Sequence, residues 1–146
     1  GSSARADTPE LVALRRWAIG EFDHGRAADV LRANVAFAFH PQRQGDAALV
    51  EDYLRMVLDR AGAADLIRQN RALIERGDRR ASLPDIGCPL LVMCGDADAL
   101  TPPECSREIA AAVPHARYVE LAQCGHMLTW ERPAEVTAAL LDWLER

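Results

Sequence analysis

One continuous apolar run, residues 89–94, constrains the fold of this chain more than any other feature. It ends directly at Gly95 and shows none of the polar alternation of a half-exposed strand. Such a run is typical of a strand in a parallel sheet, where helices cover both faces. A helix over residues 102–113 and a second strand over 116–121 follow, and a last helix begins at Pro133. The pattern predicts a strand–helix–strand–helix unit of the α/β class.

The residues before this unit predict helices alone. Apolar side chains recur at helical spacing in four segments, and Thr8-Pro9-Glu10 is a typical helix start. The first predicted helix begins at Pro9 and ends between Gly20 and Gly25, and the others cover approximately residues 27–39, 46–61 and 63–76. We therefore expect two regions, a helical region over residues 1–83 and an α/β segment over residues 84–146.

A sheet of two parallel strands is an incomplete structure. Its outer edges have unpaired backbone groups, and both faces require cover. We therefore expect further strands from a part of the protein outside these 146 residues, or pairing with a second copy of the chain.

Composition excludes several classes of function. The net charge is −5, and no block of arginines is interleaved with aromatic residues, which argues against a nucleic-acid partner. No run of 18 apolar residues exists, so we expect no membrane span, and no signal peptide is visible. The four cysteines lack the C-x-x-C spacing of a zinc or redox site. Reduced thiols of a cytoplasmic protein are the expectation.

Each predicted strand is followed by a turn that carries a titratable side chain. Gly95-Asp96-Ala97-Asp98 follows the first strand, and Cys124-Gly125-His126 follows the second. The carboxyl ends of neighbouring parallel strands meet at one edge of a sheet, so an acid and His126 are expected side by side. A buried carboxylate that accepts the imidazole Nδ1–H fixes the tautomer and stabilises the imidazolium formed in proton transfer. No Gly-x-Ser-x-Gly, the usual setting of a serine nucleophile, occurs in the sequence.

The residues alone leave other assignments open. Asp98 also suits a carboxylate that complements the dipole of the helix after Pro102. Asp96 is the second candidate acid, although its place directly after the strand favours capping of the turn. His126 also suits a buried core histidine. A metal site of Asp98, Cys124 and His126 is disfavoured because two ligands on one tight turn are poorly spaced.

The remaining candidates have structural interpretations. His24 and His40 lie at predicted helix ends, and His115 lies in a Pro-x-Ala turn that is expected to be solvated. Glu131 is expected to hydrogen-bond backbone at a helix start rather than to react.

Taken together, these motifs resemble the C-terminal third of the α/β-hydrolase superfamily, and are most similar to its esterase and lactonase-like members. The helices before them resemble the lid that this family inserts between its sixth and seventh strands. The motifs that carry the resemblance are the strand at residues 90–94, Gly95 to Asp98, Thr101-Pro102-Pro103, Pro114-His115-Ala116, Tyr118 to Leu121, Gly125-His126 and Glu131-Arg132-Pro133.

The resemblance implies a function for the parent protein. Asp98 corresponds to the acid of a Ser-His-Asp triad and His126 to its general base, and the nucleophile belongs to strands upstream of residue 1. A small ester, lactone or related acyl compound is the implied substrate, and no cofactor or metal is implied. The implied partner is the missing N-terminal half, and this chain alone is expected to be inactive. Two alternatives stay open: an inert fragment that self-associates through its sheet edge, and a dehalogenase or C–C hydrolase of the same fold.

Overall fold

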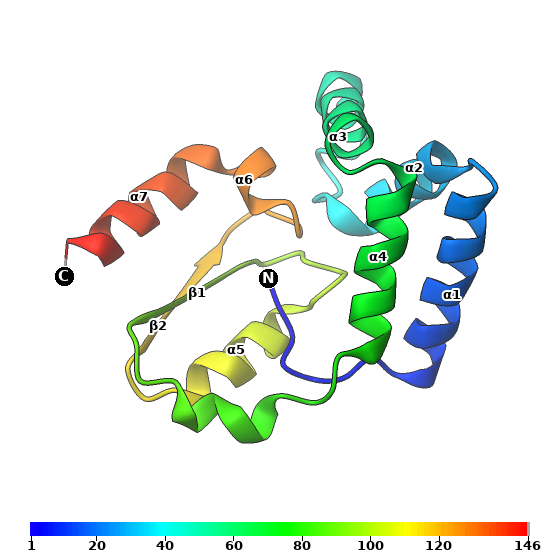
Figure 1. Cartoon of the computed structure of the whole chain (residues 1–146). Helices are drawn as coiled ribbons and strands as arrows, with labels where there is room; N and C mark the ends of the chain where they lie inside the picture. Colours follow the sequence, from blue (N-terminus) through cyan, green and yellow to red (C-terminus); the bar gives the residue numbers. More distant parts are fainter. Residues whose placement is uncertain (146) are drawn as a thin grey trace. The chain divides into compact units, whose positions relative to one another are not determined.

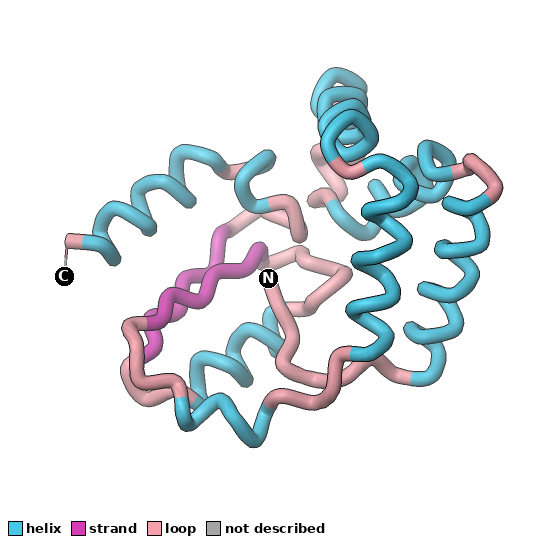
Figure 2. The backbone as a smooth tube through the Cα atoms, in the orientation of Figure 1, coloured by secondary structure: helices cyan, strands magenta, loops and turns pink. Residues whose placement is uncertain are grey.

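The computed structural model describes residues 1–145. Their helices and strands follow one another along the chain as drawn in Figures 1 and 2. In order they are α1 (Pro9–Asp23), α2 (Ala27–Ala38), α3 (Ala47–Arg60), α4 (Gly62–Glu75), the 3-10 helix η1 (Arg80–Asp85), β1 (Leu90–Gly95), α5 (Pro103–Ala112), β2 (Ala116–Leu121), α6 (Leu128–Glu131) and α7 (Pro133–Leu144). The predicted α/β class with an incomplete sheet is confirmed.

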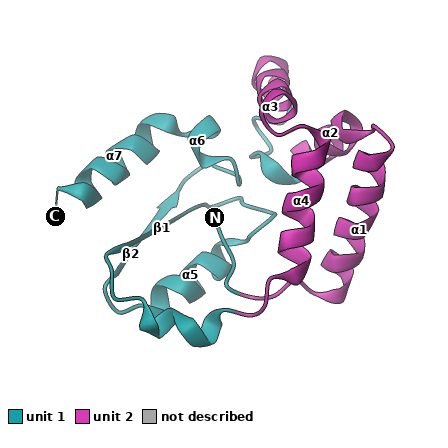
Figure 3. Cartoon of the chain, viewed as in Figure 1, with its two compact units in different colours: residues 1–4, 36–44, 79–146 teal, residues 5–35, 45–78 magenta. Residues whose placement is uncertain are grey.

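The chain divides into two compact units (Figure 3). One comprises residues 1–4, 36–44 and 79–146, and the other comprises residues 5–35 and 45–78. The sheet unit therefore includes a short segment, residues 36–44, that comes from the middle of the helical region. The assignment of residues 1–83 to a lid stays a prediction.

Within the sheet unit, β1 and β2 pair in parallel. The register runs from Leu90 opposite Ala116 to Gly95 opposite Leu121. α5 connects the two strands, as a parallel crossover requires. Apolar side chains form clusters in the described part of this unit. One contains Leu121, Cys124, Leu128 and Val136 with Met93 and Val119, and another contains Ala4, Leu83 and Val113 with neighbours that include Leu90 and Ile109.

The helical unit is organised around the pairing of α1 with α4. The Thr8 hydroxyl accepts a hydrogen bond from the Leu11 N–H and caps α1, as its sequence predicts. The helix ends at Asp23, between Gly20 and Gly25, as the sequence predicts. Gly25, with φ of 77°, supplies the left-handed residue after it. A glycine within a helix costs only about 1 kcal/mol, and Gly20 does not end α1.

Two elements were not predicted. η1 spans six residues and α6 only four, so neither is long enough to show a periodic pattern. No helix in the described part of the chain combines the length and the apolar character needed to cross a bilayer.

Candidate active site

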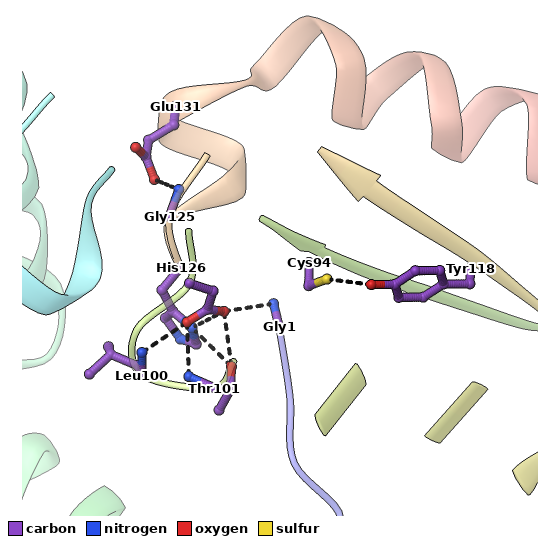
Figure 4. A network of polar contacts seen from close by, with 9 residues as sticks. Gly1, Cys94, Leu100, Thr101, Tyr118, Gly125, His126 and Glu131 are labelled. Carbon is purple, nitrogen blue, oxygen red and sulfur yellow. Dashed lines mark hydrogen bonds and ion pairs between the residues drawn. The ribbon is translucent and has the colours of Figure 1, made fainter. Parts of the chain in front are cut away.

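An acid and a histidine meet where β1 and β2 end. His126 Nδ1 lies 2.9 Å from Asp98 Oδ2, and the two residues stand on the turns that follow the two strands. Figure 4 shows the contacts around this pair. The structure therefore brings together the two side chains that the sequence singles out, over 28 residues of chain.

The Asp98 carboxylate is buried and held by several donors. One oxygen, Oδ1, accepts the N–H groups of Leu100 at 3.0 Å and Thr101 at 2.8 Å, and Oδ2 accepts the Thr101 hydroxyl at 3.0 Å. Burial raises the pKa of Asp98, but hydrogen bonds from His126 and Thr101 outweigh it and hold the pKa below its ordinary value. The group is therefore an anion at neutral pH, which is the state that accepts an imidazole N–H.

This arrangement bears on both interpretations of Asp98, as a helix-start acid and as the partner of His126. The carboxylate does tie its own turn just before α5, as a helix-start acid does. It also directs its second oxygen at the imidazole, which a helix-start acid does not require. The α-amino group of Gly1 lies 3.8 Å from the same oxygen.

The imidazole of His126 is accessible at one side. Its side chain is 29% exposed, so His126 is not an enclosed core histidine. The Thr101 hydroxyl lies 3.3 Å from Nδ1, beside the Asp98 contact. Among residues 1–145, no protein group hydrogen-bonds to Nε2. With its proton on Nδ1, the ring is able to accept a proton at Nε2.

Asp96 caps a turn, as its position after the strand favours. Its carboxylate accepts the N–H groups of Gln123 at 3.0 Å and Cys124 at 3.1 Å. Gln123 has φ of 53°, so the bonds hold a strained turn in place. Burial raises the pKa of Asp96, and the amide donors of Cys124 and Gln123 outweigh it, so the pKa lies below its ordinary value.

Cys124 lies on the same turn as His126. Cys124 is fully buried, and burial raises the pKa of its thiol to about 12. No group of three or more histidine, cysteine or acidic side chains within residues 1–145 is placed to hold a metal ion.

The other histidines make structural hydrogen bonds. The ring of His24 contacts the Gly20 carbonyl at 2.6 Å, and the exposed His115 contacts the Cys88 carbonyl at 2.7 Å. His40 Nδ1 accepts the Gln42 N–H at 3.2 Å. None of these rings contacts Asp98 or His126.

Two contributors to the site were missed by the sequence analysis. Thr101 touches both Asp98 and His126, and its position three residues after Asp98 was the available signal. Ala38 accepts the N–H groups of His126 at 2.8 Å and Met127 at 3.2 Å through its carbonyl. A backbone contact over 88 residues leaves no trace in local sequence, so no signal pointed to Ala38.

Comparison of the sequence with known proteins shows which family the chain belongs to. The profile described as "Alpha/beta hydrolase family" matches residues 2–140. The protein of Serratia proteamaculans (strain 568) named "Putative carbamate hydrolase RutD" is 32% identical over 116 residues, which is 78% of this chain and 43% of that protein.

Solved structures agree over almost the whole chain. A thermophilic esterase from Thermogutta terrifontis superposes with a TM-score of 0.88 at 26% identity, covering 97% of this chain and 52% of the esterase. The enol-lactonase from Burkholderia xenovorans LB400 gives 0.83 at 26% identity, covering 99% of this chain and 54% of the lactonase. The chain thus spans about half the length of the proteins it matches.

Proposed function

Because this chain belongs to the alpha/beta hydrolase family, we propose that it supplies the acid and the base of a serine-type hydrolase whose nucleophile lies on another part of the protein. The observation that carries the proposal is the 2.9 Å contact between His126 Nδ1 and the ionised Asp98, with Nε2 left available. The substrate class is a small ester, lactone or related acyl compound. The names of the esterase and the enol-lactonase support that class.

In the proposed reaction an upstream serine hydroxyl attacks the substrate carbonyl, and His126 Nε2 takes the hydroxyl proton. The bond to the leaving group then breaks, and the imidazolium donates that proton to the leaving oxygen. Water repeats the sequence on the acyl-enzyme, with His126 again as base, and releases the acid and the serine. Asp98 stays an anion throughout, orients the ring and stabilises the imidazolium.

The free edge of β1 supports a second proposal, which concerns the partner. In the described sheet, β2 is the one neighbour of β1, so the other edge of β1 has no strand beside it. A hollow of about 310 Å³ is lined by the four consecutive residues Leu90–Met93 together with Gly1, Ser2 and Ile109. Consecutive strand residues point to opposite faces, so a hollow that touches all four follows the edge of the strand.

The lining of this hollow favours an apolar strand as the occupant. No charged side chain is among the lining residues, and charge is a common means of protecting an exposed edge. We propose that a strand of the missing N-terminal half occupies this edge and brings the nucleophile to the site. A second copy of the chain is the competing occupant.

The direct test supplies the N-terminal half as a separate polypeptide. We expect the two parts to elute as a one-to-one complex that hydrolyses p-nitrophenyl esters, whereas each part alone gives no turnover. Short and long acyl chains are compared to define the pocket.

The outcomes of this experiment separate the two proposals. A complex that hydrolyses neither esters nor lactones contradicts the hydrolase assignment. A chain that sediments as a stable dimer at micromolar concentration and takes up no N-terminal half favours self-association through the same edge.

A further inference from the structure

We infer that Glu131 is a positioning residue for His126. Its carboxylate fixes the turn that carries His126, residues 123–127 and here called the histidine turn, to the backbone at residues 38–40. The expected effect of Glu131 on catalysis rests on the proposed function. The hydrogen bonds of Glu131 to Gly125 and His40 do not depend on it. Figure 4 shows Glu131 and its bond to Gly125 beside His126.

The turn that carries His126 is held at every backbone N–H from residue 123 to residue 127. Asp96 accepts the first two, Glu131 Oε1 accepts that of Gly125 at 2.8 Å, and the Ala38 carbonyl accepts the last two. Five consecutive amides of this segment thus have acceptors that lie outside the turn, and these hydrogen bonds hold its backbone in place. Glu131 supplies the central bond of the five.

The second oxygen of Glu131 reaches a different part of the chain. Oε2 accepts the His40 N–H at 2.8 Å, over a separation of 91 residues. Glu131 therefore bridges the Gly125 amide and the His40 amide, while the Ala38 carbonyl contacts the histidine turn directly. The two links join the same two segments, one through the Glu131 side chain and one through backbone alone.

The backbones in this region approach too closely for side chains. A Cβ atom on Gly125 would lie 2.6 Å from the His40 nitrogen and 2.7 Å from the Phe39 carbonyl carbon. A Cβ atom on Gly95 would lie 2.1 Å from the Cys124 carbonyl oxygen. The backbone at Gly125 is thus in close contact with residues 38–40, and the backbone at Gly95 is in close contact with Cys124. Glu131 hydrogen-bonds to Gly125 and to His40 and so joins the first two of these segments.

The chemistry of the Glu131 site requires a carboxylate. Its side chain belongs to a residue only 5% exposed, and within the described residues it makes no ion pair with an arginine. Its charge is met by two amide donors at 2.8 Å, each of which needs an acceptor. A glutamine offers one acceptor oxygen and one donor group, so it satisfies one amide and opposes the other.

The test compares Glu131→Gln and Glu131→Ala in the chain alone, by NMR hydrogen exchange. We expect Glu131→Gln to remove protection from one of the Gly125 and His40 amides, and Glu131→Ala to remove it from both. Exchange of the His126 Nδ1 proton should accelerate about tenfold in the alanine variant, with a smaller change in the glutamine variant. Glu135→Gln is the matched control, because Glu135 is an exposed acid near the start of α7 that forms an ion pair with Arg132 at 3.4 Å.

The same variants are then assayed in the complex with the N-terminal half. We expect Glu131→Ala to lower kcat for a p-nitrophenyl ester by about 10- to 100-fold with KM nearly unchanged, and Glu131→Gln to lie between it and the wild type. Unchanged exchange of the His126 Nδ1 proton, or a uniform rise at all amides, overturns the inference and leaves Glu131 a role in stability alone. If the wild-type complex is inactive, the proposed function fails, and the exchange data still decide the role of Glu131.

Discussion

Replacing His126 with alanine in the complex with the N-terminal half is expected to lower kcat for a short p-nitrophenyl ester by about 10⁴-fold, while KM changes less than about threefold. The imidazole is the proposed acceptor of the nucleophile's proton, and Thr101 is a neutral hydroxyl that cannot replace it. The side chain is 29% exposed, so the substitution removes a base without emptying a core position.

A matched control is available on the same unit. His115→Ala removes an exposed imidazole whose Nε2 contacts the Cys88 carbonyl, and it should leave kcat within about twofold of the wild type. Steady-state kinetics on the three proteins measures both values. A His126→Ala complex that keeps a tenth or more of the wild-type kcat contradicts the assignment of His126 as the base.

The second large effect concerns stability. Gly125→Ala is expected to lower the free energy of unfolding by about 2–4 kcal/mol, and the melting temperature by about 10 °C. The new Cβ would meet the His40 nitrogen at 2.6 Å, the Phe39 carbonyl carbon at 2.7 Å and the Ala38 oxygen at 2.8 Å. All three are backbone atoms, so relief requires a shift of one segment and breaks the bonds between residues 38–40 and the histidine turn.

The control for this substitution is Gly87→Ala. An added Cβ at Gly87 meets nothing within 4 Å, and no left-handed φ is recorded there. Thermal unfolding followed by circular dichroism should give a melting temperature within about 2 °C of the wild type for this variant. Equal melting temperatures for Gly125→Ala and Gly87→Ala would show that the segments do not pack as described.

Local sequence carried enough information to locate both strands and the two turns that follow them. The second strand was predicted at residues 116–121 and is observed there, and the first is observed one residue later than predicted, at Leu90–Gly95. A long apolar run and a turn that contains a glycine are local signals, and parallel pairing then brings Asp98 and His126 to one edge. The proximity of this pair was therefore predictable from two short segments.

Contacts between distant backbone groups were not predictable in this way. The prediction that Glu131 binds backbone is confirmed, but its partners are Gly125 and His40 rather than a helix start. The Ala38 carbonyl gave no signal of its contact with the histidine turn, and the spacing of three residues from Asp98 was the one signal of the Thr101 contact. Every residue has a backbone carbonyl, so the residue type at position 38 does not indicate what its carbonyl binds. A threonine before two prolines is equally suited to a helix start, so only the folded chain distinguishes the two roles of Thr101.

The tautomer of His126 tests the central claim most directly, because catalysis as proposed requires its proton on Nδ1 beside an ionised Asp98. Nitrogen-15 NMR of the neutral ring in the chain alone should show the proton on Nδ1 and an unprotonated Nε2. In Asp98→Asn the side-chain amide can donate to Nδ1, and the proton should move to Nε2. A wild-type ring protonated at Nε2, or a tautomer that is the same in both proteins, would contradict the pairing on which the proposed function depends.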